Sequence, residues 1–504
     1  MNPLSIFPRS AVRLLAVLVA AGTLIFAAGC GFGGGGNGGG GGGGGNQGFS
    51  KASLNGRYVF TMRGVGLLPG SLTQADYFVE GGVFTADGNG NLTAGTDDFV
   101  QGGIPASDPI TGAYSISSDG SGELRLDFST GSTRFRITLV DNAHFYLAED
   151  DGFRTSYGSG EKQDQALLST IPSGTFVVRA HDSGAVSFVP AATMAKLAIS
   201  GGAITGSYYL LESGSPSSGS VTGAVGTPTD GRGTLNYTLN GTTHGFFYYV
   251  VSSGKFRLLE QSPNSVSLGQ AEAQSAITFS NSSLSGSYAF GSNGETTFID
   301  GINTVGAFTT DGGGNVTDGN FDSVQDGVVS SNMPVTSGTY TINSDGFGTY
   351  FLGSAQNAIW MVSPSRAYFI ALNGINTEDG TLDKQTGTFS NSSWSKQAAF
   401  FMDGFDGTSV LFKDRVGTLT PDGSGALKTN YVSSFFDPNL IVAGSQSNNF
   451  SGNYAVSGNG RTTAQLNGFT NNLVLYLVSN NNGYFLQADP SINIGGAFTQ
   501  QTGP

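Results

Sequence analysis

Residues that could do chemistry are few in this chain of 504 residues. It contains three histidines, His144, His181 and His244, and each occupies a different position of an internal repeat. A zinc ion or a general base shared by all repeat units would need histidine at equivalent positions. A site inside one unit would have to combine a single histidine with carboxylates. We therefore expect structural histidines, no catalytic, metal-binding or cofactor-binding residues, and no enzyme.

Acidic residues in turns could suggest calcium. Asp87-Gly-Asn-Gly-Asn91 and Asp311-Gly-Gly-Gly-Asn315 offer oxygen ligands in tight loops. Calcium takes six to eight oxygens, usually from several carboxylates, and each loop supplies one carboxylate. These segments are therefore predicted to be ordinary hairpin turns. The acidic clusters Asp97-Asp98 and Glu149-Asp150-Asp151 are expected to be solvated charge, and no carboxylate pair suited to glycoside hydrolysis stands out.

The single cysteine, Cys30, follows an apolar run at positions 14–28 that is preceded by Arg9 and Arg13. About fifteen residues are short for a membrane span, and the charged start and small-residue end are typical of a secretion signal. Ala27-Ala28-Gly29-Cys30 resembles the lipobox of bacterial lipoproteins. The resemblance implies removal of the signal peptide 1–29 and lipid attachment at Cys30. An ordinary cleaved signal and an uncleaved anchor are the alternatives.

A tether is predicted at residues 30–50, because positions 31–46 are glycine except for Phe32, Asn37 and Asn46. Such a flexible chain of about 16 residues reaches roughly 20 to 25 Å. Gly31 directly after the cysteine resembles lipoproteins sorted to the outer membrane. The expected location is therefore the bacterial cell envelope, at the outer membrane, facing either the periplasm or the outside.

Composition limits the partners. The formal net charge is −14, and it becomes −16 when Arg9 and Arg13 leave with the signal. An acidic surface is repelled by nucleic acids and by anionic lipid headgroups, so the membrane contact is expected through the lipid at Cys30 alone. The 36 Phe, 18 Tyr and 2 Trp exclude a disordered stalk beyond the tether.

A repeat of about 111 residues organises the rest of the chain. A glycine followed five positions later by glutamine recurs at spacings of 111, 111 and 116, and turn pairs such as Asp87-Gly88 and Asp311-Gly312 keep the same phase. The glutamines are Gln163, Gln274, Gln385 and Gln501. The predicted units span residues 51–165, 170–276, 280–387 and 388–504.

Within a unit, apolar and polar residues alternate, as at positions 124–128 and 133–139, and Asp-Gly or Asn-Gly pairs separate the runs. This pattern predicts antiparallel hairpins in series. In the first unit the expected strands are 57–64, 77–86, 91–99, 111–118, 121–128, 133–140, 143–150 and 154–163. Eight such strands favour an all-β fold of four small up-and-down barrels, because closure hides every edge. A sandwich and a propeller remain alternatives.

Three motifs recur in units one and three, and they resemble the repeat of uncharacterised secreted lipoproteins of soil bacteria. In the first unit they are Leu54-x-Gly56-x-Tyr58-x-Phe60, Phe84-Thr-x-Asp87-Gly-x-Gly-Asn91 and Gly112-x-Tyr114-x-Ile116-x-x-Asp119-Gly-x-Gly122. The resemblance implies tethered β-rich repeats and no known activity. A looser similarity to avidin- or lipocalin-type barrels rests on the strand number and the opening Gly-x-Tyr.

Two functions follow from these predictions. The first is a non-enzymatic envelope or cell-surface lipoprotein whose repeats bind or adhere to an envelope or extracellular macromolecule. The second is a carrier that holds a small apolar molecule inside a barrel. About thirteen aromatic residues per unit are enough to fill an eight-stranded barrel, which favours the first function. The oligomeric state is left open.

Overall fold

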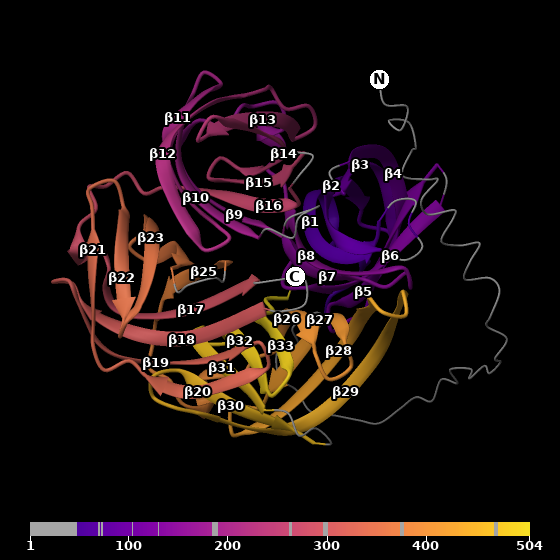
Figure 1. The fold of residues 1–504 in the computed structure, drawn as a ribbon. Coiled ribbons are helices and arrows are strands. Elements are labelled where there is room, and N and C mark those ends of the chain that lie inside the picture. The colour runs from indigo at the N-terminus through magenta and orange to yellow at the C-terminus, as the bar shows by residue number, and fades with distance from the viewer. Residues whose placement is uncertain are drawn as a thin grey trace.

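The computed structural model describes residues 48–503, apart from 69–70, 72–73, 103, 130, 184–189, 262–264, 296–300, 373–376 and 468–471. The predicted signal peptide, Cys30 and residues 31–47 of the tether lie outside the described residues. Strands dominate, in four groups that follow one another along the chain (Figure 1). In the part of the chain that is described, no helix is long and apolar enough to cross a membrane.

Barrel 1 is a meander of eight antiparallel strands that closes on itself. Each strand pairs with the next, and β8 also pairs with β1, from Tyr58 opposite Lys162 to Gly66 opposite Arg154. Closure leaves no unpaired sheet edge. The strands are β1 Asn55–Leu67, β2 Ala75–Asp87, β3 Asn91–Gln101, β4 Ile104–Ile116, β5 Ser121–Phe128, β6 Gly131–Leu139, β7 His144–Glu149 and β8 Arg154–Lys162.

Barrels 2 and 4 close in the same way, with β16 pairing with β9 and β33 with β26. Barrel 2 contains β9 Gly174–Asp182, β10 Ala191–Ser200, β11 Ala203–Glu212, β12 Ser215–Val225, β13 Arg232–Leu239, β14 Thr242–Ser252, β15 Lys255–Glu260 and β16 Ser267–Ala273. Barrel 4 contains β26 Ala398–Asp406, β27 Leu411–Pro421, β28 Ala426–Asp437, β29 Val442–Val456, β30 Arg461–Leu466, β31 Asn472–Ser479, β32 Asn482–Asp489 and β33 Ile492–Gln500.

Barrel 3 differs because its fourth strand is broken into β20 and β21, which both pair with β19. Asn332, near the end of β20, adopts a φ of +52°, in the left-handed region that interrupts an extended strand. Its strands are β17 Ser285–Glu295, β18 Gly301–Asp311, β19 Asn315–Gln325, β20 Val328–Pro334, β21 Gly338–Ile342, β22 Phe347–Leu352, β23 Ala355–Ser363, β24 Arg366–Ala371 and β25 Thr377–Lys384.

These pairings confirm the all-β fold of four up-and-down barrels and exclude the sandwich and the propeller. One predicted strand of the first unit, 111–118, was wrong at its start. The structure begins β4 at Ile104, because β3 and β4 form a long hairpin in which Gln101 lies opposite Ile104. The predicted turns hold, and Gly88 and Gly312 adopt φ values of +76° and +77°.

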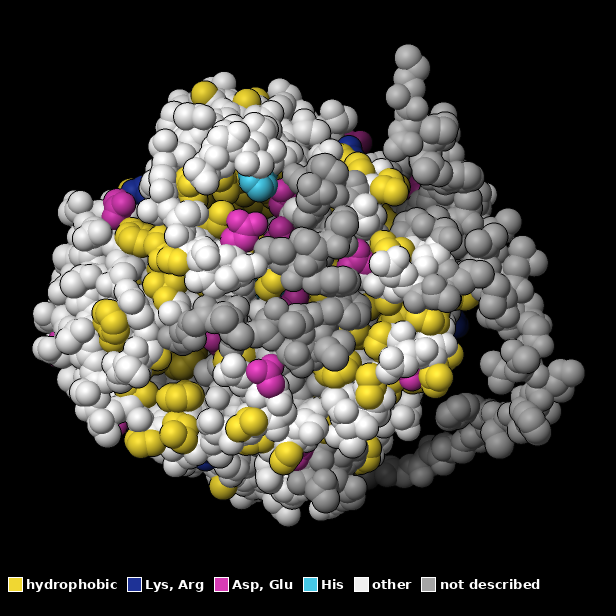
Figure 2. Space-filling model, viewed as in Figure 1, with side chains coloured by type: hydrophobic (Ala, Val, Ile, Leu, Met, Phe, Trp, Pro, Cys, Tyr) yellow, Lys and Arg dark blue, Asp and Glu magenta, His cyan; other side chains and the backbone are white. Residues whose placement is uncertain are grey.

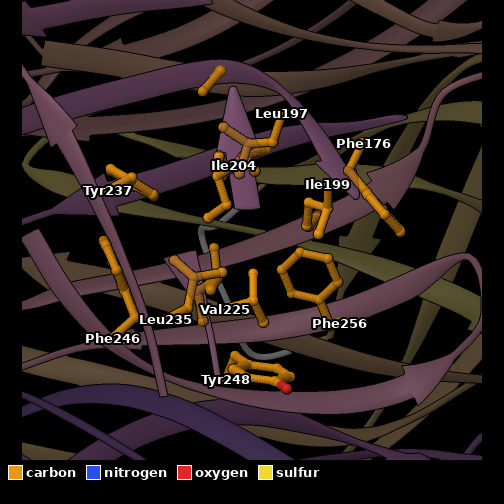
Figure 3. Close-up of a cluster of buried hydrophobic side chains, with 14 of the residues drawn as sticks. Phe176, Leu197, Ile199, Ile204, Val225, Leu235, Tyr237, Phe246, Tyr248 and Phe256 are labelled. Carbon is orange, nitrogen blue, oxygen red and sulfur yellow. The ribbon is translucent and has the colours of Figure 1, made fainter. Parts of the chain in front are cut away.

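Packed side chains fill the barrel interiors, as the number of aromatic residues predicts. In barrel 2, Phe176, Leu197 and Phe256 belong to a buried cluster whose side chains point toward one another (Figure 3). Equivalent clusters occupy the other barrels. A cavity inside barrel 4, between Phe400 and Phe485, measures about 30 Å³, room for roughly one or two water molecules.

The tyrosines of the repeat motif secure one end of a barrel. Tyr114 donates its hydroxyl hydrogen bond to the carbonyl of Leu54 over 2.7 Å, and Tyr340 donates to Leu284 over 2.8 Å. Each receiving carbonyl lies just after a short 3₁₀ turn that precedes the first strand: η1 Lys51–Ser53, η3 Asn281–Ser283 and, in barrel 4, η4 Asn391–Ser393. Barrel 2 is preceded instead by η2 Gln165–Leu167. The motif thus ties the chain that enters a barrel to its fourth strand.

The four barrels form a closed ring (Figure 1), and the repeat glutamines connect them. At the end of each barrel, the glutamine side chain donates to a backbone carbonyl of the next barrel. Gln163 reaches Val250 over 2.6 Å, Gln274 reaches Met361 over 2.8 Å, Gln385 reaches Leu477 over 2.7 Å, and Gln501 reaches Leu139 of barrel 1 over 2.6 Å. The last contact closes the ring, so the marker found in the sequence is a ring contact.

Apolar clusters and buried ion pairs complete the interfaces. One cluster joins barrels 1, 2 and 4, a second joins barrels 2 and 3, and a third joins barrels 3 and 4. Asp98 of barrel 1 accepts two hydrogen bonds of 2.6 Å from Arg232 of barrel 2. Asp322 of barrel 3 receives Arg461 of barrel 4 in the same way, at 2.8 and 2.7 Å. The interface between barrels 1 and 2 is therefore repeated between barrels 3 and 4.

Candidate functional site

The candidate site is a cavity of about 1080 Å³ at the centre of the ring, lined by all four barrels. The first and last strands of each barrel supply most of its walls, because these two strands pair with each other and their outward faces turn toward the ring axis. The turns that connect β6 with β7, β14 with β15, β23 with β24 and β31 with β32 line one end. The cavity therefore lies between the barrels.

The turn end of the cavity carries four donors at equivalent positions of the barrels. They are His144, Lys255, Arg366 and Asn482, which begin β7, β15, β24 and β32. Their sequence spacings are 111, 111 and 116, the same as those of the repeat glutamines. The side chains of His144 and Arg366 are 52% and 39% exposed, so this end is the mouth.

Beside these donors lie acceptors from the last strands: Glu161, Glu272, Asp383 and Thr499. The first three are the direct cross-strand partners of His144, Lys255 and Arg366. Lys255 and Arg257 of barrel 2 bind Glu161 of barrel 1 at 2.7 and 2.6 Å. Burial alone would raise the pKa of Glu161, but the two cations outweigh it and hold that pKa at about 2. Arg366 likewise joins Glu272 of barrel 2 at 3.3 Å and Asp383 of its own barrel at 2.7 Å.

The opposite, inner end is formed by equivalent residues of the four first strands: Arg63, His181, Asn293 and Asp403. Arg63 donates to Asp403 over 3.3 Å and lies 3.7 Å from Glu295. His181 is only 8% exposed, and its Nδ1 lies 2.5 Å from Asp379, which also binds Arg179. Burial and the nearby Arg63 lower the pKa of His181, and the contacts with Asp379 and Glu295 outweigh them and raise it.

Aromatic side chains provide the remaining wall. The rings of Tyr157 and Phe401 stack with centroids 5.5 Å apart, across the interface between barrels 1 and 4. Tyr146 shares a hydrogen bond of 2.8 Å with Thr499, and Tyr484 donates to Asp383 over 2.6 Å. The cavity thus offers flat apolar faces next to paired charges and hydroxyl groups.

Two of the three histidines line the central cavity. His144 and His181 come from different barrels and line the same cavity, at its mouth and its inner end. His244 lies elsewhere, 2.7 Å from Glu260 in barrel 2. The sequence analysis considered sites within units and sites shared at one repeat position, and it missed a site assembled between units from successive positions. The common spacing of 144, 255, 366 and 482 was the available signal.

The acidic clusters were also misjudged. Asp98 is fully buried because Arg232 and Tyr249 of barrel 2 cover it, the latter donating over 2.6 Å. Asp150 is buried by Arg136, at 2.5 Å, and by Ser445 of barrel 4. The fully buried side chains of Asp97 and Glu149 also have partners. Asp98 and Asp150 are buried because residues of other barrels cover them, and the local sequence cannot indicate such partners.

The turn aspartates use their oxygens within their own turns. Asp87 Oδ1 accepts from the backbone N–H of Asn89 at 2.7 Å and of Asn91 at 3.0 Å, and the Asn91 amide donates to Oδ2 at 2.8 Å. These hydrogen bonds hold the pKa of Asp87 at about 2. In the described residues, no group of three or more His, Cys, Asp or Glu is arranged to hold a metal ion. Cys30, the predicted lipid attachment site, lies outside them.

Comparisons with known proteins give no family. No family model matches the chain, and no curated protein matches it. Kievitone hydratase from Nectria haematococca shares 7% identity, with a TM-score of 0.17, over 68% of this chain and 94% of that one. Transferrin Binding Protein B from Haemophilus parasuis Hp5, as a double mutant, shares 9% identity, with a TM-score of 0.16, over 71% and 83%. Similarity at this level carries no argument about function.

Proposed function

We propose that this chain is a non-enzymatic binding protein of the bacterial cell envelope, which takes a polar segment of an envelope or extracellular macromolecule into the central cavity. The observation that carries the proposal is the position of the free volume. About 1080 Å³ lies between the barrels, whereas the cavity inside barrel 4 measures about 30 Å³. Binding pockets commonly have roughly 300 to 1,000 Å³.

The alternative function, a carrier of a small apolar molecule, is less well supported. Such a molecule would need an apolar barrel interior with free volume, and these interiors hold packed aromatic and aliphatic side chains. The central cavity is lined by ion pairs and hydroxyl groups, which an apolar ligand would strip of water without replacing their hydrogen bonds.

Attachment through a lipid at Cys30 and location at the outer membrane belong to this proposal, and they rest on the lipobox resemblance. The tether would keep the ring within roughly 20 to 25 Å of the membrane while leaving it free to turn. Cys30→Ser in the full chain should move the protein from the membrane fraction to the soluble fraction of the envelope. Retention in the membrane fraction would contradict lipid attachment.

A variant that fills the cavity tests the binding function. Ala497, on β33, lines the cavity, and Ala224, on β12, is an exposed alanine outside it. Labelled protein spanning residues 48–504 should bind to bacterial envelope fractions. Ala497→Trp should reduce that binding at least tenfold, whereas Ala224→Trp should leave it unchanged. Equal binding by the two folded variants would contradict the proposal.

A further inference from the structure

The charges that line the central cavity are already neutralised by one another. All five carboxylates in its wall take part in ion pairs, namely Asp141 with His144, Glu161 with Lys255 and Arg257, Glu272 and Asp383 with Arg366, and Asp403 with Arg63. Arg179 pairs with Asp379 at the inner end. Lys384 lies 5.9 Å from the ring centre of Tyr288.

A closed set of ion pairs disfavours a ligand with net charge. A charged group that entered this cavity would meet charges of its own sign beside most charges of opposite sign. To gain an ion pair, it would have to separate an existing one and leave a charge without compensation, which is unfavourable. A neutral ligand avoids this cost.

A ligand that carries hydroxyl groups suits the polar groups of the cavity wall. A hydroxyl both donates and accepts, so it can bridge a guanidinium and a carboxylate without separating them. Amide and hydroxyl side chains also line the cavity, namely Asn482 at the mouth, Tyr484 and Gln270, and Asn293 and Asn303 at the inner end. A carbonyl-rich ligand could only accept from these groups, and a purely apolar ligand could do neither.

The stacked rings of Tyr157 and Phe401 add an apolar surface beside these polar groups. A pyranose ring has apolar C–H faces and a rim of hydroxyl groups, so its C–H groups can contact the edges of these two rings while the rim reaches the ion pairs. Burial of the C–H groups contributes by the same hydrophobic mechanism as burial of any apolar area.

We propose that the central cavity of the ring binds an uncharged saccharide, as the terminal segment of a polysaccharide that enters past His144, Lys255, Arg366 and Asn482. This inference rests on the proposed function and specifies the ligand. The depth of the cavity, from these four residues to Arg63 and Asp403, and its volume of about 1080 Å³ suit a short oligosaccharide rather than one sugar unit.

Calorimetric titration with trisaccharides of matched length tests the inference. The probes are maltotriose and triacetylchitotriose, which are neutral, deacetylated chitotriose, which is cationic, and trigalacturonate, which is anionic. We expect a neutral trisaccharide to bind with a dissociation constant of millimolar or below and each charged one to bind at least tenfold more weakly. Raising the salt concentration from 50 to 500 mM should change the neutral affinity less than twofold.

Variants connect the binding to the cavity. Ala497→Trp should weaken binding of the neutral trisaccharide at least tenfold, and Ala224→Trp should leave that binding unchanged. If Ala497→Trp does not fold, Thr381→Phe and Gln270→Leu, on the walls from barrels 3 and 2, replace it. Stronger binding of a charged probe, or no trisaccharide binding while Ala497→Trp still abolishes binding to envelope fractions, would overturn the saccharide inference and leave the proposed function. If no trisaccharide binds and Ala497→Trp also leaves binding to envelope fractions unchanged, both proposals are overturned.

Discussion

At the scale of single residues, Asp76 is a buried carboxyl group whose pKa is raised. Its side chain is 1% exposed, and one carboxylate oxygen accepts from the backbone N–H of Tyr77 at 2.8 Å. The other oxygen has no hydrogen-bond partner among the residues that the structure describes. Burial raises the pKa of Asp76 to about 7, and the hydrogen bond from Tyr77 lowers it only in part. The folded state therefore prefers the protonated acid, while the unfolded chain ionises near pH 4.

This difference predicts a pH dependence of stability. The contribution of Asp76 is complete below about pH 4 and is lost as the pH rises through 7, because the unfolded state releases its proton first. Three pH units correspond to about 4 kcal/mol. We expect the Asp76→Asn variant not to lose this free energy of unfolding between pH 4 and 8. Urea titration, with hydrogen exchange of the β2 amides as the readout, measures it. Asp87→Asn is the control, because the low pKa of Asp87 places its effect below pH 4. An unchanged pH profile in Asp76→Asn would disprove the assignment.

At the scale of elements, the end of each last strand connects one barrel to the next. Gln501 donates to the carbonyls of Leu139 and Asp119, and the backbone N–H of Thr502 donates to Val140 over 2.9 Å. The same arrangement follows β8, β16 and β25. A segment of two residues thus connects neighbouring barrels by hydrogen bonds.

Gln501→Ala should therefore destabilise the interface between barrels 4 and 1. Two partly buried carbonyls lose their donor, which costs about 1 to 3 kcal/mol of unfolding free energy. Urea unfolding of the full ring measures it. Gln446→Ala, at an exposed position of β29, should change stability by less than about 0.5 kcal/mol. Equal effects of the two substitutions would show that the glutamine does not secure the ring.

At the scale of the whole molecule, the junction between barrels 4 and 1 has the same contacts as a junction between barrels that follow one another in the chain. Phe49 donates its backbone N–H to Ser118, just as Phe279 donates to Ser344 in barrel 3. Four residues separate Gln274 from Phe279, and joining Pro504 directly to Gly48 would place four residues between Gln501 and Phe49. Phe49 and Gln501 thus contact the same turn of barrel 1, because Gln501 also donates to Asp119.

A circular permutant joined in this way and opened between the exposed residues Ile277 and Thr278 should fold to the same ring. Its Tm should lie within about 5 °C of that of the original order, because every interface between barrels is kept and only one loop is exchanged for another. Small-angle scattering measures the ring, and calorimetry measures the Tm. An expanded permutant with independent barrels would mean that chain order, and not the interfaces, holds the ring together.

The acidic composition is visible at this scale. Few Lys and Arg side chains lie on the face shown in Figure 2, and acidic side chains lie near its centre. Many of the cations are used inside the ring, where Arg63, Arg179, Arg257 and Arg366 line the cavity. The molecule therefore concentrates paired charge at its axis.

The sequence by itself determined the parts of this protein that depend on neighbouring residues. Alternation of apolar and polar residues defines a strand with one buried face, and an Asp-Gly pair defines a turn, so eight strands per unit and the barrel could be predicted. The spacing of the glutamines Gln163, Gln274, Gln385 and Gln501 defined the repeat. The sequence did not show that these side chains contact the following barrel.

Only the tertiary structure decided which outward-facing residues are covered. Glu161, Asp98 and Arg63 are charged residues on strands, and their local sequence is the same as that of a solvent-exposed position. Their partners, Lys255, Arg232 and Asp403, lie between 94 and 340 residues away along the chain. Closure of the ring and the central cavity, which His144 and His181 both line, follow from packing between barrels. Local periodicity carries no information about such long-range contacts.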